Sequence, residues 1–143
     1  MEFINYLNPS EMEVYEMVRK KVRVDENASI CRKHQFFGFF DAKTRKLTIC
    51  TETISKSWDV RAHINETLMH ESVHVAQSCK SDFAFLDSFG IKTSLMPLSS
   101  AKENDLRKVL AFDSKLRQTD REAFWMEDKP GIVKYVVKKY CRL

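Results

Sequence analysis

The first apolar stretch of the chain recurs at helical spacing. Its apolar side chains are Met12, Val14, Tyr15, Met17, Val18 and Val22. Pro9 suits the first position of a helix, and Asn8 and Glu11 stand at the spacing of a capping box. Acidic residues come early in this segment and basic residues late, an order that complements a helix dipole. The pattern predicts an N-terminal helix that ends near residues 22–24.

The pattern changes to short β-prone runs between residues 29 and 53. The first run contains Phe36, Phe37, Phe39 and Phe40, and the second covers residues 47–51 after a polar segment at 41–46. Two such runs around a polar turn predict an antiparallel hairpin. Gly38 inside the first run indicates a bulge or a close approach of the backbone. Phenylalanines here could line a cleft, although in a hairpin they more often belong to the core.

A second helical pattern follows the hairpin. The apolar residues Val60, Ile64, Leu68, Val75 and Ala76 recur at helical spacing between about residues 57 and 79, without Gly or Pro. Residues 81–98 then predict a long connection, which in a small domain is often functional. Ser100 and Glu103 have capping-box spacing and open a helix that extends to Met126, with a bend near residues 118–119. Residues 132–141 favour a last helix.

Composition supports one α+β domain over residues 1–143. The chain is 43% hydrophobic and 31% charged, and its length is typical of a single domain. No apolar run approaches the roughly 20 residues of a membrane span, and the N-terminus lacks the pattern of a secretory signal. We therefore expect a cytoplasmic protein without a membrane partner. The cysteines at 31, 50, 79 and 141 form no CxxC pair, so we expect reduced thiols that fill the core.

Basic residues gather in two places. The 24 basic and 20 acidic residues give a net charge of +4, with clusters at residues 19–23 and 134–142. Both clusters are interleaved with apolar residues, which is typical of the solvated face of a helix. The charge pattern therefore disfavours nucleic acid as a partner.

One motif in the second helical pattern carries a mechanism. In His70-Glu71-Ser72-Val73-His74 the two histidines are four apart, so they project from one helix face and can bind one zinc ion. Glu71 is rotated by about 100° from His70, where it can act as the general base on a water. Residues 67–76 carry no other charged side chain, which indicates a buried helix whose polar groups need a partner. The alternative is a pair of core histidines that hydrogen-bond to neighbours.

The stretch TLMHESVHVA, residues 67–76, resembles the extended signature of the zincin metallopeptidases. A strand pair before such a helix and further helices after it also resemble the minimal architecture of that family. The resemblance implies a small zincin-like α+β domain that holds one Zn²⁺ ion. It also implies hydrolysis of peptide bonds in a peptide or protein substrate.

A third zinc ligand has to come from elsewhere in the chain. The metzincin branch requires a histidine and a glycine where this chain has Lys80 and Gln77, so that branch does not fit. Glu122, followed by Ala123, resembles the downstream glutamate of the gluzincin branch, which implies a ligand set of His70, His74 and Glu122. The alternatives are Asp120, Asp113 and Glu103. No spacing selects an oxyanion-stabilising residue among Tyr135, Tyr140 and His63.

Two other functions compete with a zinc metallopeptidase. A non-catalytic, zinc-stabilised binding module would close its metal site with four protein ligands. A nucleic-acid-associated regulatory module would use the basic clusters and show strong salt dependence. The sequence fixes neither the substrate nor the oligomeric state.

Overall fold

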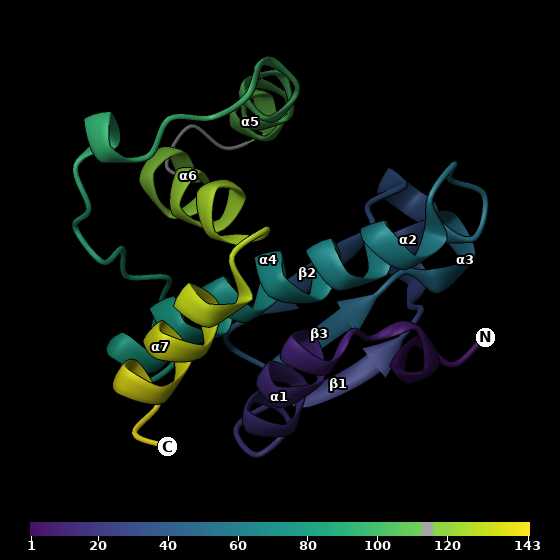
Figure 1. Ribbon diagram of the computed structural model, residues 1–143, viewed down its shortest axis with the longest axis horizontal. Coiled ribbons are helices and arrows are strands. Elements are labelled where there is room, and N and C mark those ends of the chain that lie inside the picture. Colours follow the sequence, from purple (N-terminus) through teal and green to yellow (C-terminus); the bar gives the residue numbers. More distant parts are fainter. Residues whose placement is uncertain (113–115) are drawn as a thin grey trace.

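A long central helix, α4 (Val60–Lys80), crosses a small mixed sheet (Figure 1). The structure is a computed structural model that describes residues 1–112 and 116–143. The other elements are η1 (Phe3–Tyr6), α1 (Pro9–Val18), β1 (Arg23–Glu26), α2 (Ser29–His34), β2 (Gly38–Asp41), β3 (Lys46–Ile49), α3 (Thr51–Ile54), η2 (Thr93–Leu95), α5 (Ser100–Phe112), α6 (Arg117–Met126) and α7 (Pro130–Tyr140). The α+β prediction is confirmed.

The sheet has the strand order β1-β3-β2. Strands β2 and β3 pair antiparallel, with Gly38 opposite Ile49, which confirms the hairpin. Strand β1 pairs parallel to β3, with Arg23 opposite Lys46. The sheet is therefore mixed rather than a hairpin alone, because residues 23–26, which were expected to end the N-terminal helix, join it as a third strand.

Helix α1 is shorter than its apolar pattern predicts. It ends at Val18, and the backbone turns so that the N–H of Arg23 can donate to the carbonyl of Arg45. The Asn8 side chain makes no capping hydrogen bond; instead the Asn8 N–H donates to Asn65 on α4. Pairing with β3 thus outweighs continuation of the helix.

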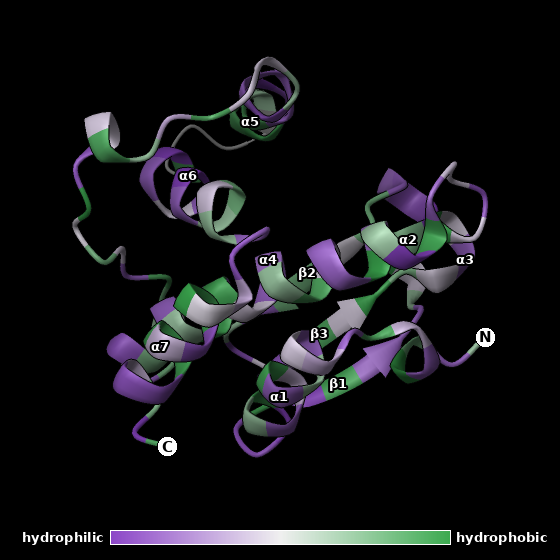
Figure 2. Cartoon of the chain, viewed as in Figure 1, coloured by the Kyte–Doolittle hydropathy of each residue, from purple (hydrophilic) through white to green (hydrophobic). Residues whose placement is uncertain are grey.

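The core lies around α4. Its residues Ile64, Leu68, Met69, Val73, Val75 and Ala76 have no exposed surface. Helix α4 contacts α1, α6, α7 and the strands β2 and β3. Figure 2 shows α7 with hydrophobic residues toward α4 and hydrophilic residues on its outer side. The length of α4 therefore lets one helix support both the sheet and the C-terminal helices.

The C-terminal third of the chain differs partly from its prediction. The helix expected from Ser100 to Met126 is two helices, α5 and α6, and Ser99 rather than Ser100 accepts the capping hydrogen bond from Lys102. The long connection at residues 81–98 and the helical tail are confirmed. No helix of the described part of the chain is both long and apolar enough to cross a membrane.

All four cysteines are paired, so the prediction of reduced thiols is wrong. Cys31–Cys50 joins α2 to the residue after β3, and Cys79–Cys141 joins the end of α4 to the residue after α7. Spacing along the chain does not reveal which cysteines meet in space. Disulfides persist mainly in oxidising compartments, so these pairs favour such a compartment over the cytoplasm.

Candidate metal centre

Helix α4 places the two motif histidines one turn apart. Asp59 caps its N-terminus by accepting from the N–H of Ala62, and no Gly or Pro interrupts the 21 residues that follow. The ring centroids of His70 and His74 are 5.1 Å apart. Both rings project toward α6, so the helix alone fixes two donors of the centre.

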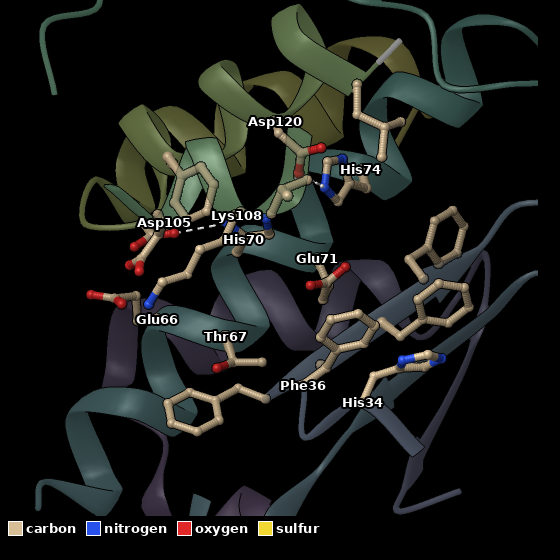
Figure 3. A pocket seen from close by; sticks show the side chains of 18 of the residues that line it. His34, Phe36, Glu66, Thr67, His70, Glu71, His74, Asp105, Lys108 and Asp120 are labelled. Atoms are coloured by element: carbon tan, nitrogen blue, oxygen red, sulfur yellow. Dashed lines mark hydrogen bonds and ion pairs between the residues drawn. The ribbon is translucent and has the colours of Figure 1, made fainter. Parts of the chain in front are cut away.

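Asp120 of α6 completes a group of three. Its Oδ1 lies 3.2 Å from Nε2 of His74 and 3.5 Å from Nε2 of His70. Figure 3 shows the Asp120 carboxylate directed toward the two imidazoles. The candidate ligand atoms all lie within 4.8 Å of one another, and no fourth His, Cys, Asp or Glu of residues 1–112 and 116–143 joins them.

The donor set fits a tetrahedral divalent cation. Metal–ligand bonds of about 2.0–2.1 Å at tetrahedral angles separate neighbouring ligand atoms by about 3.3 Å. The two distances from Asp120 to the imidazoles bracket that value. Imidazole nitrogens with one carboxylate oxygen are typical zinc ligands, and three protein ligands leave one position open.

Each histidine is also held through its other ring nitrogen. Nδ1 of His70 donates to Oε1 of Glu127 at 2.8 Å, and Nδ1 of His74 donates to Oε1 of Gln77 at 2.8 Å. Such partners orient the ring and leave Nε2 for the metal. Neither Glu127 nor Gln77 was predicted as a partner of these histidines, although Asp120, Phe124 and Glu127 have the spacing of one helical stripe.

Hydrogen bonding and burial shape the charges at the centre. Burial by itself would lower the pKa of His70 and His74, but hydrogen bonds with Asp120 and the charges of the neighbouring carboxylates together outweigh it and raise the pKa of both. Burial would raise the pKa of Asp120, yet the two imidazoles hold that pKa well below its usual range. Without a cation, hydrogen bonds between the two imidazoles and Asp120 therefore hold these three side chains together. A bound metal would displace the protons of those bonds.

Glu122 does not join the histidines. It lies about 200° around α6 from Asp120. Its carboxylate accepts from Gln77 Nε2, Gln118 Nε2 and the N–H of Phe89. The ligand expected at Glu122 is therefore replaced by Asp120 in this geometry.

The remaining candidates for the third ligand lie elsewhere. Glu103 forms an ion pair with Arg121 at 2.9 Å, away from the histidines. Asp113 lies outside the described residues. Asp120 is thus the alternative that the structure brings to the centre.

Glu71 lies beside the centre in a cleft of about 850 Å³. Burial raises the pKa of its carboxyl, while the two motif histidines oppose this effect. Gly38 of β2 lies close to it, since a Cβ on Gly38 would lie 3.2 Å from Cγ of Glu71. The glycine therefore marks the close backbone approach that the sequence indicates, and it keeps the edge strand next to Glu71.

Aromatic and apolar side chains form the cleft walls. They include the phenylalanines of residues 36–40 and, from the second half of the chain, Leu86, Val109, Leu116 and Phe124. Of the four hairpin phenylalanines only Phe40 is buried. Phe40 belongs to the core and Phe37 packs against it, so the core role holds for these two, while all four side chains also line the cleft.

The oxyanion candidates are separated by the fold. His63 lines the cleft and contacts Ser57 through Nδ1 at 2.8 Å. Tyr135 is 62% exposed on α7, and Tyr140 stacks on Phe89. Of the three, His63 alone is among the residues that line the cleft with Glu71.

The basic clusters are partly neutralised by local ion pairs. Lys134 pairs with Glu13 at 2.9 Å, and Arg19 pairs with Glu16 at 2.8 Å. Neither pair lies among the residues that line the cleft. This pairing is what a solvated helix surface shows, and it adds nothing in favour of nucleic-acid binding.

Comparison with known proteins gives a family but no activity. The chain belongs to a family described as a domain of unknown function (DUF8637), whose family model matches residues 3–142. No curated protein and no solved structure matches the chain. Its function is therefore inferred from the geometry of the centre.

Proposed function

We propose that the protein is a zinc-dependent metallopeptidase. The observation that carries this proposal is the convergence of His70, His74 and Asp120 beside Glu71 in one cleft. His70, His74 and Asp120 would hold a single Zn²⁺ ion. Bound zinc would polarise the scissile carbonyl and make a water nucleophilic near neutral pH.

In this proposal Glu71 carries a proton from the attacking water to the leaving amine. Its carboxylate takes a proton from the attacking water as the new C–O bond forms. It then delivers that proton to the leaving amine as the C–N bond breaks. In the metal-free protein, burial raises the pKa of the Glu71 carboxyl, which supports its role as the base because a carboxylate with a higher pKa accepts a proton more readily.

The cleft offers an extended peptide a place to bind. β2 lies at the edge of the sheet and lines the cleft with Gly38, Phe39 and Phe40. An edge strand can pair with a substrate backbone, while neighbouring pockets select its side chains. The apolar walls therefore favour polypeptides with bulky apolar residues near the scissile bond.

The disulfides support a place of action outside the reducing cytoplasm. Cys31–Cys50 lies close to this cleft, because Ile30 and His34 on the same helix line it. A peptidase with such a cleft wall keeps its shape where disulfides are stable. Substrates of the same compartment are therefore the first to test.

A peptide library with mass-spectrometric readout tests the activity. The zinc-loaded protein is expected to cleave peptides next to apolar residues, and Glu71→Gln is expected to bind one zinc and cleave none. Zinc binding without cleavage in wild type would favour the non-catalytic binding module. Cleavage by Glu71→Gln at the wild-type rate would contradict the role given to Glu71.

A further inference from the structure

Gln77 occupies an unusual place behind the metal centre. It lies on α4 with no exposed surface, although its amide has four hydrogen-bonding positions. Its Nε2 donates to the backbone carbonyl of Thr119 at 3.0 Å and to Oε1 of Glu122 at 2.9 Å. Its Oε1 lies 2.8 Å from Nδ1 of His74. The amide thus connects α6 to one of the candidate metal ligands.

These contacts fix which way the Gln77 amide points. Thr119 and Glu122 both present oxygen acceptors, and only the NH₂ end of the amide can donate to them. The amide oxygen must therefore face His74. Since that oxygen can only accept, Nδ1 of His74 must carry a proton, and Nε2 is the nitrogen left to bind a metal.

Glu122 is the anchor of this arrangement. Its carboxylate is fully buried, and both oxygens accept from the N–H of Phe89 at 3.0 Å. Gln118 Nε2 donates to Oε2 at 3.2 Å and also binds the carbonyl of Ile91. Glu122 therefore holds the connection at residues 89–91 in place as well as orienting Gln77.

We propose that Gln77 and Glu122 are positioning residues that keep a proton on Nδ1 of His74, so that Nε2 faces Asp120 and a bound metal. The metal part of this proposal rests on the proposed function, whereas the position of the proton does not. Neither residue touches the metal position. Both act through the ring of His74.

Zinc affinity tests the metal part. Gln77→Met keeps the length of the side chain but removes both ends of the amide, and it is expected to weaken zinc binding by about 10–100-fold. Glu122→Gln is expected to weaken it less. The double variant should match Gln77→Met alone, because Glu122 acts through Gln77. If the affinity losses of the two single variants add in the double variant, Glu122 does not act through Gln77.

Gln118→Met is the matched control. It removes another partner of Glu122 but leaves the contacts of Gln77 and His74 untouched. We expect its zinc affinity to stay within about twofold of wild type, while its stability falls. An equal loss of affinity in both methionine variants would show that general loosening of α6, not Gln77, is responsible and would overturn the proposal.

The proton itself can be observed by ¹H–¹⁵N NMR of the histidine rings. We expect a slowly exchanging Nδ1 proton on His74 in both the metal-free and the zinc-loaded protein, and its fast exchange in Gln77→Met. If Gln77→Met does not fold, Gln77→Leu and Glu122→Gln serve for the same spectrum. Absence of a protected Nδ1 proton in wild type would overturn the proposal.

The two readouts separate two kinds of failure. If wild type binds no zinc but keeps the protected proton, the proposed metallopeptidase is wrong and the positioning role stands. If wild type binds zinc and Gln77→Met binds it equally well, the positioning role is wrong and the metal centre stands.

Discussion

Asp120 and Glu122 show how a helix separates the roles of neighbouring carboxylates. Both lie buried on α6, but Asp120 faces the histidines and Glu122 faces the connection that follows α4. Resemblance favoured the glutamate, because its place downstream of the motif and the alanine after it resemble a known branch. The helical stripe that contains Asp120 and Glu127 was the better physical signal.

Removal of the Asp120 carboxylate therefore tests the ligand set. Asp120→Ala is expected to lower zinc affinity by more than the roughly 10–100-fold that an outer partner contributes. Glu122→Gln should lower zinc affinity less than Asp120→Ala does. Isothermal titration with a competing chelator measures both. A larger loss in Glu122→Gln than in Asp120→Ala would contradict the arrangement of the centre.

Glu66 gives a prediction for pH. It lines the cleft, and partial burial together with the carboxylate of Glu127 raises its pKa from 4.5 to about 7. The folded state thus binds this proton more tightly than the unfolded chain, so ionisation of Glu66 opposes folding. The resulting loss in the free energy of unfolding is absent well below pH 4.5 and fully present above about pH 7.

Glu66→Gln removes this cost because the amide stays neutral. We expect the variant to raise the Tm of the metal-free protein at about pH 8.5 and to differ much less from wild type at about pH 5. Thermal unfolding followed by circular dichroism measures both values. The same Tm difference at the two pH values would contradict the raised pKa.

The secondary structure that depends on local sequence could be predicted. The hairpin β2–β3, helix α4 and helix α7 follow from periodicity and nearby turn residues. Strand β1 could not, because only four residues pair, and their partner β3 lies more than 20 residues away. The bend expected near residues 118–119 is wrong, because α6 begins at Arg117 and continues through both residues.

Contact between β2 and α4 depends on Gly38. A Cβ there would lie 2.5 Å from Cγ2 of Thr67 and 3.1 Å from the carbonyl oxygen of Thr48, which cannot move alone. Gly38→Ala is therefore expected to push β2 from α4 and to cost about 1–3 kcal/mol of stability. Urea unfolding measures this loss, and peptide cleavage should fall with it.

Gly131→Ala provides the control for this change. A Cβ at Gly131 meets nothing within 4 Å, and the residue lies in the first turn of α7. We expect stability to stay the same or to rise by about 0.4–1 kcal/mol. Equal losses in the two alanine variants would mean that the tight approach of β2 is not what Gly38 provides.

The disulfides link distant parts of the fold. Cys79–Cys141 closes a loop of 62 residues, and Cys31–Cys50 closes one of 19. Chain entropy assigns the longer loop about 4 kcal/mol and the shorter one about 3 kcal/mol. Neither pair was predicted, because pairing depends on how α2 lies against the end of β3 and how α4 and α7 pack, not on spacing along the chain.

Replacing each pair by alanines is expected to lower the free energy of unfolding, more for Cys79–Cys141 than for Cys31–Cys50. The Cys31–Cys50 variant should also lower cleavage, because α2 forms part of the cleft wall. Urea titration of both variants under oxidising conditions gives the two losses. No loss in either variant would contradict the pairing.

A crystal structure of the zinc-loaded protein, with anomalous diffraction at the zinc edge, is the most direct test of the metal centre. We predict one anomalous peak bonded to Nε2 of His70, Nε2 of His74 and the carboxylate of Asp120, with its remaining position open to the cleft. A peak bonded to four protein side chains, or no peak between the two imidazoles, would contradict the catalytic zinc centre.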